Sequence, residues 1–185
     1  MSREIQTMTS KYPLISRRSL VAGAALGIAS IVMPKSAYGS TTDSETMGQK
    51  AHNLWLDAVR KAKEQGVAVS DRMTHTAPTA TPRTYTTGRA DMAILNWVQP
   101  DRATAIAVYD ALSNGNIGEV YDAWVVCMAS TVENLTYQDT KLDQGRTLCV
   151  NYTCSLRNTI TLGEAFEFYA EFYNDGSGWM SGGVV

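Results

Sequence analysis

The chain has 185 residues, of which 44% are hydrophobic, with 16 Lys and Arg against 18 Asp and Glu. Five of the basic residues and one of the acidic residues lie in the first 39 positions, so the remainder holds 11 basic and 17 acidic residues and has a net charge of −6. This length fits one domain. The acidic body argues against nucleic acid or an anionic membrane surface as a partner, because both attract basic surfaces.

An arginine pair, Arg17-Arg18, stands just before an uncharged run over residues 20–33. The run has 14 residues and includes two glycines, whereas a helix that spans a membrane needs about 20 apolar residues. The run is therefore predicted to be the core of a signal sequence and not a permanent membrane span.

Small residues follow this run, with Ala37 and Gly39 placed as in a signal cut between Gly39 and Ser40. Together with Arg17-Arg18, they resemble a bacterial twin-arginine signal peptide. The resemblance implies that residues 1–39 are cleaved and that the twin-arginine export machinery carries the protein, already folded, to a periplasmic or secreted location. Proteins with such a signal often carry a cofactor or travel bound to a partner, and a minority simply fold too fast for export in the unfolded state. The resemblance therefore favours a cofactor or a complex and identifies neither.

The mature part, 40–185, is predicted to form a single globular domain that is helical over 44–115. The clearest helix covers 44–65, where Asp43 or Ser44 is expected to cap the start and Gly66 to end it. Its apolar residues recur on one face at helical spacing: Met47, Ala51, Leu54, Trp55, Ala58, Val59 and Ala62.

A second helix is predicted from Asp101, after Pro100, to about Leu112. In that helix Ile106, Tyr109 and Leu112 would share the face that points to the core.

From residue 117 the apolar pattern changes to a period of two, which predicts a β-rich part over 117–173. Strands are expected over 119–129, 146–156 and 165–173, and 174–185 is expected to be a loose tail. The predicted fold is therefore α+β, with N-terminal helices packed on one face of a C-terminal antiparallel sheet.

Two short segments resemble known folds. The stretch Tyr109-Asp110-Ala111-Leu112-Ser113-Asn114-Gly115-Asn116 resembles the helix-to-loop segment of the nuclear-transport-factor-2-like family, which implies a curved sheet with a pocket behind N-terminal helices. The stretch Leu162-Gly163-Glu164 resembles the entry to a strand in immunoglobulin-like β-sandwiches.

The three cysteines are Cys127, Cys149 and Cys154. If 146–156 is one strand, Cys149 and Cys154 point to opposite faces about 16 Å apart, too far for a disulfide. A bridge between Cys127 and Cys154 is therefore expected, with Cys127–Cys149 as its rival. A turn within the strand would allow a Cys149–Cys154 bridge, and a fully reduced, buried set is a further alternative.

The outer face of the 165–173 strand is the candidate ligand site. Glu167, Tyr169, Glu171 and Tyr173 alternate acid with aromatic on that face. Aromatic side chains beside carboxylates suit sugars or cationic ligands. A solvated sheet face with the same residues is the alternative interpretation.

No catalytic set or metal motif stands out in the sequence. Neither histidine, His52 or His75, has another His or a Cys within a few residues in the sequence. A structural zinc site uses closely spaced Cys or His pairs. No catalytic residue, no metal ligand and no particular cofactor is therefore predicted.

These features together favour an exported, non-catalytic protein. It would be either an accessory subunit of a periplasmic complex, with a protein partner there, or a module that binds a small ligand. The alternative is a small periplasmic enzyme with a pocket between the helices and the sheet that uses Asp, Glu and Tyr groups.

The export prediction is tested by replacing Arg17 and Arg18 together with Lys. We expect the wild-type periplasmic fraction to contain a chain that starts at Ser40, and we expect the variant to stay in the cytoplasm at full length. Mass spectrometry of both fractions measures this. An Arg3→Lys variant is the control, and periplasmic recovery of the double variant at the control's level would contradict the prediction.

Overall fold

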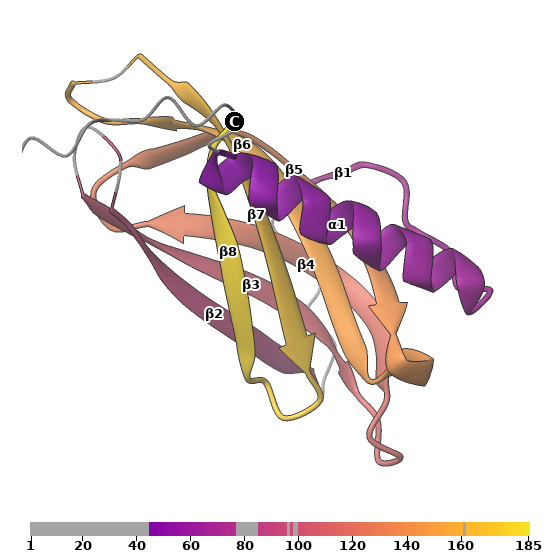
Figure 1. Cartoon of the computed structure of the whole chain (residues 1–185). Coiled ribbons are helices and arrows are strands. Elements are labelled where there is room, and N and C mark those ends of the chain that lie inside the picture. The colour runs from indigo at the N-terminus through magenta and orange to yellow at the C-terminus, as the bar shows by residue number, and fades with distance from the viewer. Residues whose placement is uncertain (1–44, 77–84, 96, 98–99, 161) are drawn as a thin grey trace, which may run out of the picture. The chain divides into compact units, whose positions relative to one another are not determined.

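The computed structural model describes residues 45–76, 85–95, 97, 100–160 and 162–185, all of which belong to one compact unit, 41–185. The predicted signal peptide, with Arg17, Arg18 and the cut between Gly39 and Ser40, lies outside the described residues. Eight strands of the described part form two antiparallel sheets, and one α-helix accompanies them (Figure 1). The predicted α+β fold is therefore wrong, because the described part is mostly β and the region expected to be helical, 44–115, contains one helix and three strands.

The larger sheet has five strands in the order β1-β5-β6-β7-β8. Its strands are β1 Met73–Thr74, β5 Thr131–Leu142, β6 Thr147–Arg157, β7 Glu164–Tyr173 and β8 Gly178–Val184. Strands β5 to β8 pair in chain order, and a 3-10 turn at Asp143–Gly145 joins β5 to β6. The expected loose tail, 174–185, therefore contains an edge strand of this sheet.

The smaller sheet has three strands, β2 Thr86–Ile94, β3 Asp101–Ala111 and β4 Ile117–Cys127, in chain order. Its inner side faces the larger sheet and consists mostly of small residues, whereas the opposing β6 and β7 supply aromatic rings. The small members are Ala90, Ala103, Ala105, Ala107 and Ala123, and the rings include Tyr152, Phe166, Phe168 and Phe172. Facing sheets pack about 10 Å apart, so these alanines leave room for rings of the opposite sheet, while larger residues of the small sheet such as Tyr109 and Ile117 fill other parts of the same core.

The segment predicted as a second helix is strand β3, so that prediction is wrong. Its alanines favour a helix when taken alone, and its apolar residues fit a helical face and a strand face equally well. Pairing with β2 on one side and β4 on the other decides between them. In the strand, Ile106 and Tyr109 are three residues apart and so point to opposite faces, and Leu112 is exposed.

The two segments that resemble known folds take strand and turn positions. The stretch 109–116 forms the end of β3 and the turn into β4, so the helix that its resemblance implies is absent. The stretch 162–164 leads into β7, and Gly163 takes a positive φ of 102° there.

The helix predicted over 44–65 is confirmed as α1, Met47–Glu64. Thr46 caps it by accepting a hydrogen bond from the Gln49 amide at 3.0 Å, while Asp43 and Ser44 lie outside the described residues. Gly66 ends it as predicted, with a positive φ of 69° and with the Val67 amide bonded to the Ala62 carbonyl at 2.8 Å. Within the described part of the chain, no helix has both the length and the apolar character needed to cross a membrane.

Helix α1 lies across the outer face of the five-stranded sheet (Figure 1). Its buried side packs on sheet residues that point away from the sandwich interior, and these include Leu142, Cys149 and Tyr169. The outer face of this sheet is therefore partly enclosed.

All three cysteines carry free thiols, so the expected Cys127–Cys154 bridge is not formed. Cys154 is in the core on β6, and Cys127 lies against the same core from the opposite sheet. A bridge between sheets about 10 Å apart requires a closer local approach, since bonded cysteines have Cα atoms roughly 4.4–6.8 Å apart. Cys149 points to the other face, under α1. Burial raises the pKa of each thiol to about 12.

Packing between the sheets is tested by truncating a leucine in the core. Leu148 is 0% exposed and Leu95 is 73% exposed. We expect Leu148→Ala to lower the free energy of unfolding by about 2–5 kcal/mol, because it removes buried surface and leaves a cavity. Leu95→Ala is the matched control, with an expected change within about 0.5 kcal/mol. Urea unfolding measures both, and equal losses would contradict the sandwich core.

The thiol state is tested by alkylation without a reductant. After denaturation we expect all three cysteines to take up iodoacetamide. In the folded protein at pH 8 we expect slow reaction, because the thiols are shielded and their pKa values lie near 12. Intact mass gives the number of adducts, and a single adduct after denaturation would show that a disulfide is present.

Candidate functional site

The four predicted ligand residues lie on the outer face of β7, as their alternation indicated, and the structure divides them into two groups. Tyr169 is buried beneath α1, next to Trp55 and Cys149. Glu171 and Tyr173 belong to one hydrogen-bonded cluster with Tyr169, whereas Glu167 belongs to a separate network. The stretch is therefore not one continuous aromatic platform.

The Glu171 cluster is complete without a ligand. The Glu171 carboxylate accepts hydrogen bonds from the Tyr169 hydroxyl at 2.8 Å, from the Trp179 indole N–H at 2.9 Å and from the Tyr173 hydroxyl at 3.3 Å. Burial is the main cause that raises the pKa of Tyr169 well above its usual value. Two of these donors are on β7 and one is on β8, so the Glu171 side chain links β7 to β8.

Glu167 has a different environment. The residue is 7% exposed, and its Oε1 lies 2.9 Å from Nδ1 of His52 on α1 and 2.9 Å from the side-chain amide nitrogen of Asn151 on β6. Its second oxygen, Oε2, accepts no hydrogen bond from the described residues. The network thus joins the helix to two strands and leaves one carboxylate oxygen unused.

The Asn151 side chain leaves a second acceptor unused. Asn151 is 6% exposed, and its Oδ1 is buried without a hydrogen-bond partner among the described residues. Its orientation follows from chemistry, because an ionised Glu167 only accepts hydrogen bonds and so requires the NH₂ end of the amide. A buried acceptor without a donor costs about 1–3 kcal/mol.

The two residues that carry these acceptors, Asn151 and Glu167, line a hollow of about 410 Å³, which we name the α1–sheet cleft. It lies between His52, Trp55 and Leu56 of α1 and Thr136, Asn151, Thr153 and Glu167 of the sheet. The cleft is open to solvent on one side, so a small molecule has direct access to it.

The side chain of Arg72 supplies a positive charge at the end of this cleft away from Glu167. Arg72 also lines the hollow, and its Nε donates to the Thr136 hydroxyl at 2.8 Å. Thr136, Thr153 and Glu167 are register partners on β5, β6 and β7. Neighbouring strands lie roughly 4.8 Å apart, so about 10 Å separates the backbone positions of Thr136 and Glu167. The cleft therefore has a cationic end and an anionic end.

The other histidine, His75, takes part in a smaller polar contact elsewhere. Its Nδ1 lies 2.9 Å from Oδ2 of the buried Asp122 without the alignment of a hydrogen bond, and its ring packs on Trp124 at a centroid distance of 5.2 Å. The hollow beside it is lined mainly by apolar side chains. No group of three or more potential metal ligands occurs among the described residues.

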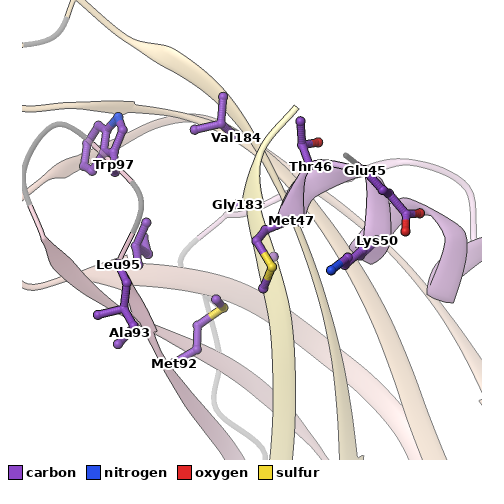
Figure 2. Close-up of a pocket in the computed structure, with 12 residues that line it drawn as sticks. Glu45, Thr46, Met47, Lys50, Met92, Ala93, Leu95, Trp97, Gly183 and Val184 are labelled. Carbon is purple, nitrogen blue, oxygen red and sulfur yellow. The ribbon is translucent and has the colours of Figure 1, made fainter. Parts of the chain in front are cut away.

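A larger hollow of about 530 Å³, the edge groove, lies where β2 and β8 approach one another (Figure 2). Met47 and Lys50 border it from the start of α1, Met92 borders it from β2, and Leu95 borders it from just after β2 (Figure 2). It is mainly apolar and lacks the converging buried polar groups of the α1–sheet cleft, so we place the candidate site in the cleft.

Alternation along β7 predicted the outward direction of Glu167 but gave no indication of its partners. Nothing in the local sequence pattern relates His52 or Asn151 to this residue. Arg72 was not singled out. Their contacts join residues as far as 115 positions apart in the sequence, and a local sequence pattern cannot indicate which distant residues will be in contact.

Comparison of the chain with protein-family models, with curated proteins and with solved structures found no significant match.

Proposed function

We propose that the protein is an exported, non-catalytic module that binds a small polar ligand in the α1–sheet cleft. The observation that carries this proposal is the unpartnered, buried Oδ1 of Asn151 beside the buried carboxylate of Glu167. Buried acceptors are normally satisfied, and a donor from a ligand would remove the cost of leaving Oδ1 of Asn151 unpaired.

The proposal includes export by the twin-arginine machinery to the periplasm or beyond, as the sequence predicts. A role as an accessory subunit is compatible with ligand binding, since the edge groove is separate from the cleft and leaves a surface for a protein partner. The acidic mature part argues against nucleic acid as that partner.

A second candidate is the small enzyme with a pocket between helix and sheet. The Nδ1 contact with Glu167 orients the His52 imidazole and leaves Nε2 as an acid or base toward the cleft. This function predicts that the bound molecule is converted over time and that His52→Gln stops the conversion while the molecule still binds.

The binding function is tested with a panel of polar small molecules that includes amino acids, sugars, polyols and carboxylic acids. We expect at least one class to raise the melting temperature of the wild-type protein and to lose this effect in Asn151→Leu, because that variant removes the free acceptor and the amide donor to Glu167. Differential scanning fluorimetry, followed by calorimetric titration, measures this.

Asn53→Leu is the matched control, because Asn53 is an exposed residue of the same helix that carries His52. We expect it to bind as the wild type does. An equal response in both variants, or no response to any class in the wild type, would contradict ligand binding in the cleft.

A further inference from the structure

The free polar atoms on the floor of the α1–sheet cleft are both acceptors. Oε2 of Glu167 receives no hydrogen bond from the described residues, and Oδ1 of Asn151 is buried without one. A 2.9 Å hydrogen bond from the side-chain amide nitrogen of Asn151 to Oε1 of Glu167 joins the two side chains that carry these oxygens. A ligand that fits this floor must therefore bring at least two donor hydrogens on one atom or on neighbouring atoms.

The negative charge of the Glu167 carboxylate favours some donor groups of a ligand over others. Glu167 is nine-tenths buried, and its ionic partner is the partly exposed His52. No Lys or Arg of the described part forms an ion pair with it. A buried carboxylate is stabilised most by a donor that also carries positive charge. An ammonium group supplies that charge and three hydrogens, whereas a hydroxyl supplies one hydrogen and no charge.

The opposite end of the cleft fits an anion. Arg72 uses its Nε on Thr136, so its two terminal NH₂ groups are without a partner among the described residues. Such a fork matches the geometry of a carboxylate. The hydrogen bond from Arg72 Nε to the Thr136 hydroxyl holds the guanidinium at this end of the cleft.

The backbone separation of the two ends is of the same order as the reach of a short zwitterion. Two strand spacings give about 10 Å between the backbone positions of Thr136 and Glu167. In an α-amino acid the nitrogen and the carboxyl carbon are about 2.5 Å apart. One hydrogen bond of ~2.9 Å at each end extends the reach of the molecule to about 8 Å.

We infer that the ligand of the α1–sheet cleft is a free α-amino acid, with its ammonium on Glu167 and Asn151 and its carboxylate on Arg72. This inference rests on the proposed binding function and adds the class of ligand to it. The apolar side chains of Trp55 and Leu56 line the same hollow and form a wall for the side chain of the amino acid.

The test is calorimetric titration of the wild-type protein with the common L-α-amino acids, one at a time. For the tightest of them we then titrate its N-acetyl derivative and its amide. We expect each blocked form to bind at least tenfold more weakly, because each loses one charged contact. Equal affinity of the N-acetyl derivative would overturn the assignment of the ammonium.

Variants assign each end of the ligand. Arg72→Gln should weaken binding of the free amino acid at least tenfold and leave the affinity for its amide unchanged. Arg89→Gln, at an exposed position of β2, is the matched control and should change neither affinity. Glu167→Gln should weaken binding of the amino acid and of its amide alike. Because Arg72 is exposed, its variant keeps the test valid even if Glu167→Gln fails to fold.

Failure of the inference differs from failure of the proposed function. If a sugar or polyol binds in an Asn151-dependent manner and no amino acid does, the function stands and the ligand class is wrong. If no small molecule binds, both are wrong. If an amino acid binds equally well to the wild type and to Arg72→Gln, the assignment of the carboxylate is wrong.

Discussion

The packing of aromatic rings against alanines between the two sheets is the constraint on which the rest of the structure depends. The side chains of Tyr152, Phe166, Phe168 and Phe172 on β6 and β7 point inward. The facing strands β2, β3 and β4 carry five alanines in the same core. A spacing of about 10 Å between sheets limits how many large side chains can meet at one place. The alanines of the small sheet make room for the rings of the large sheet, and Tyr109 is the large ring that the small sheet adds to this core.

This core also determines what the outer face presents. Because side chains alternate along a strand, burying the phenylalanines of β7 sends Glu167, Tyr169 and Glu171 to the opposite side. A slip of one residue in register would bury both carboxylates between the sheets. The polar network of the candidate site is thus a consequence of the hydrophobic core on the other face of the same strand.

Helix α1 converts this outer face into a site. It buries Tyr169 and Cys149, and it brings His52 to within hydrogen-bond distance of Glu167. The helix encloses the carboxylate only in part, so Oε2 of Glu167 and the buried side-chain oxygen of Asn151 have no donor among the described residues. The contrast with Glu171 supports this interpretation, because that carboxylate has three donors from its own sheet and leaves no role for a ligand.

The sequence by itself determined the features that depend on neighbouring residues. These are the amphipathic helix α1 with its terminating Gly66, and the alternation of β6 and β7, which correctly separates inward from outward side chains. Tertiary structure alone decided that residues 101–111 form a strand, because their apolar pattern fits a helix until β2 and β4 pair with them. It also decided that the glycine-rich end becomes β8, which depends on the edge offered by β7. The candidate site also depends on tertiary structure. Glu167 contacts His52, which is 115 residues away in the sequence, only because α1 packs on the sheet.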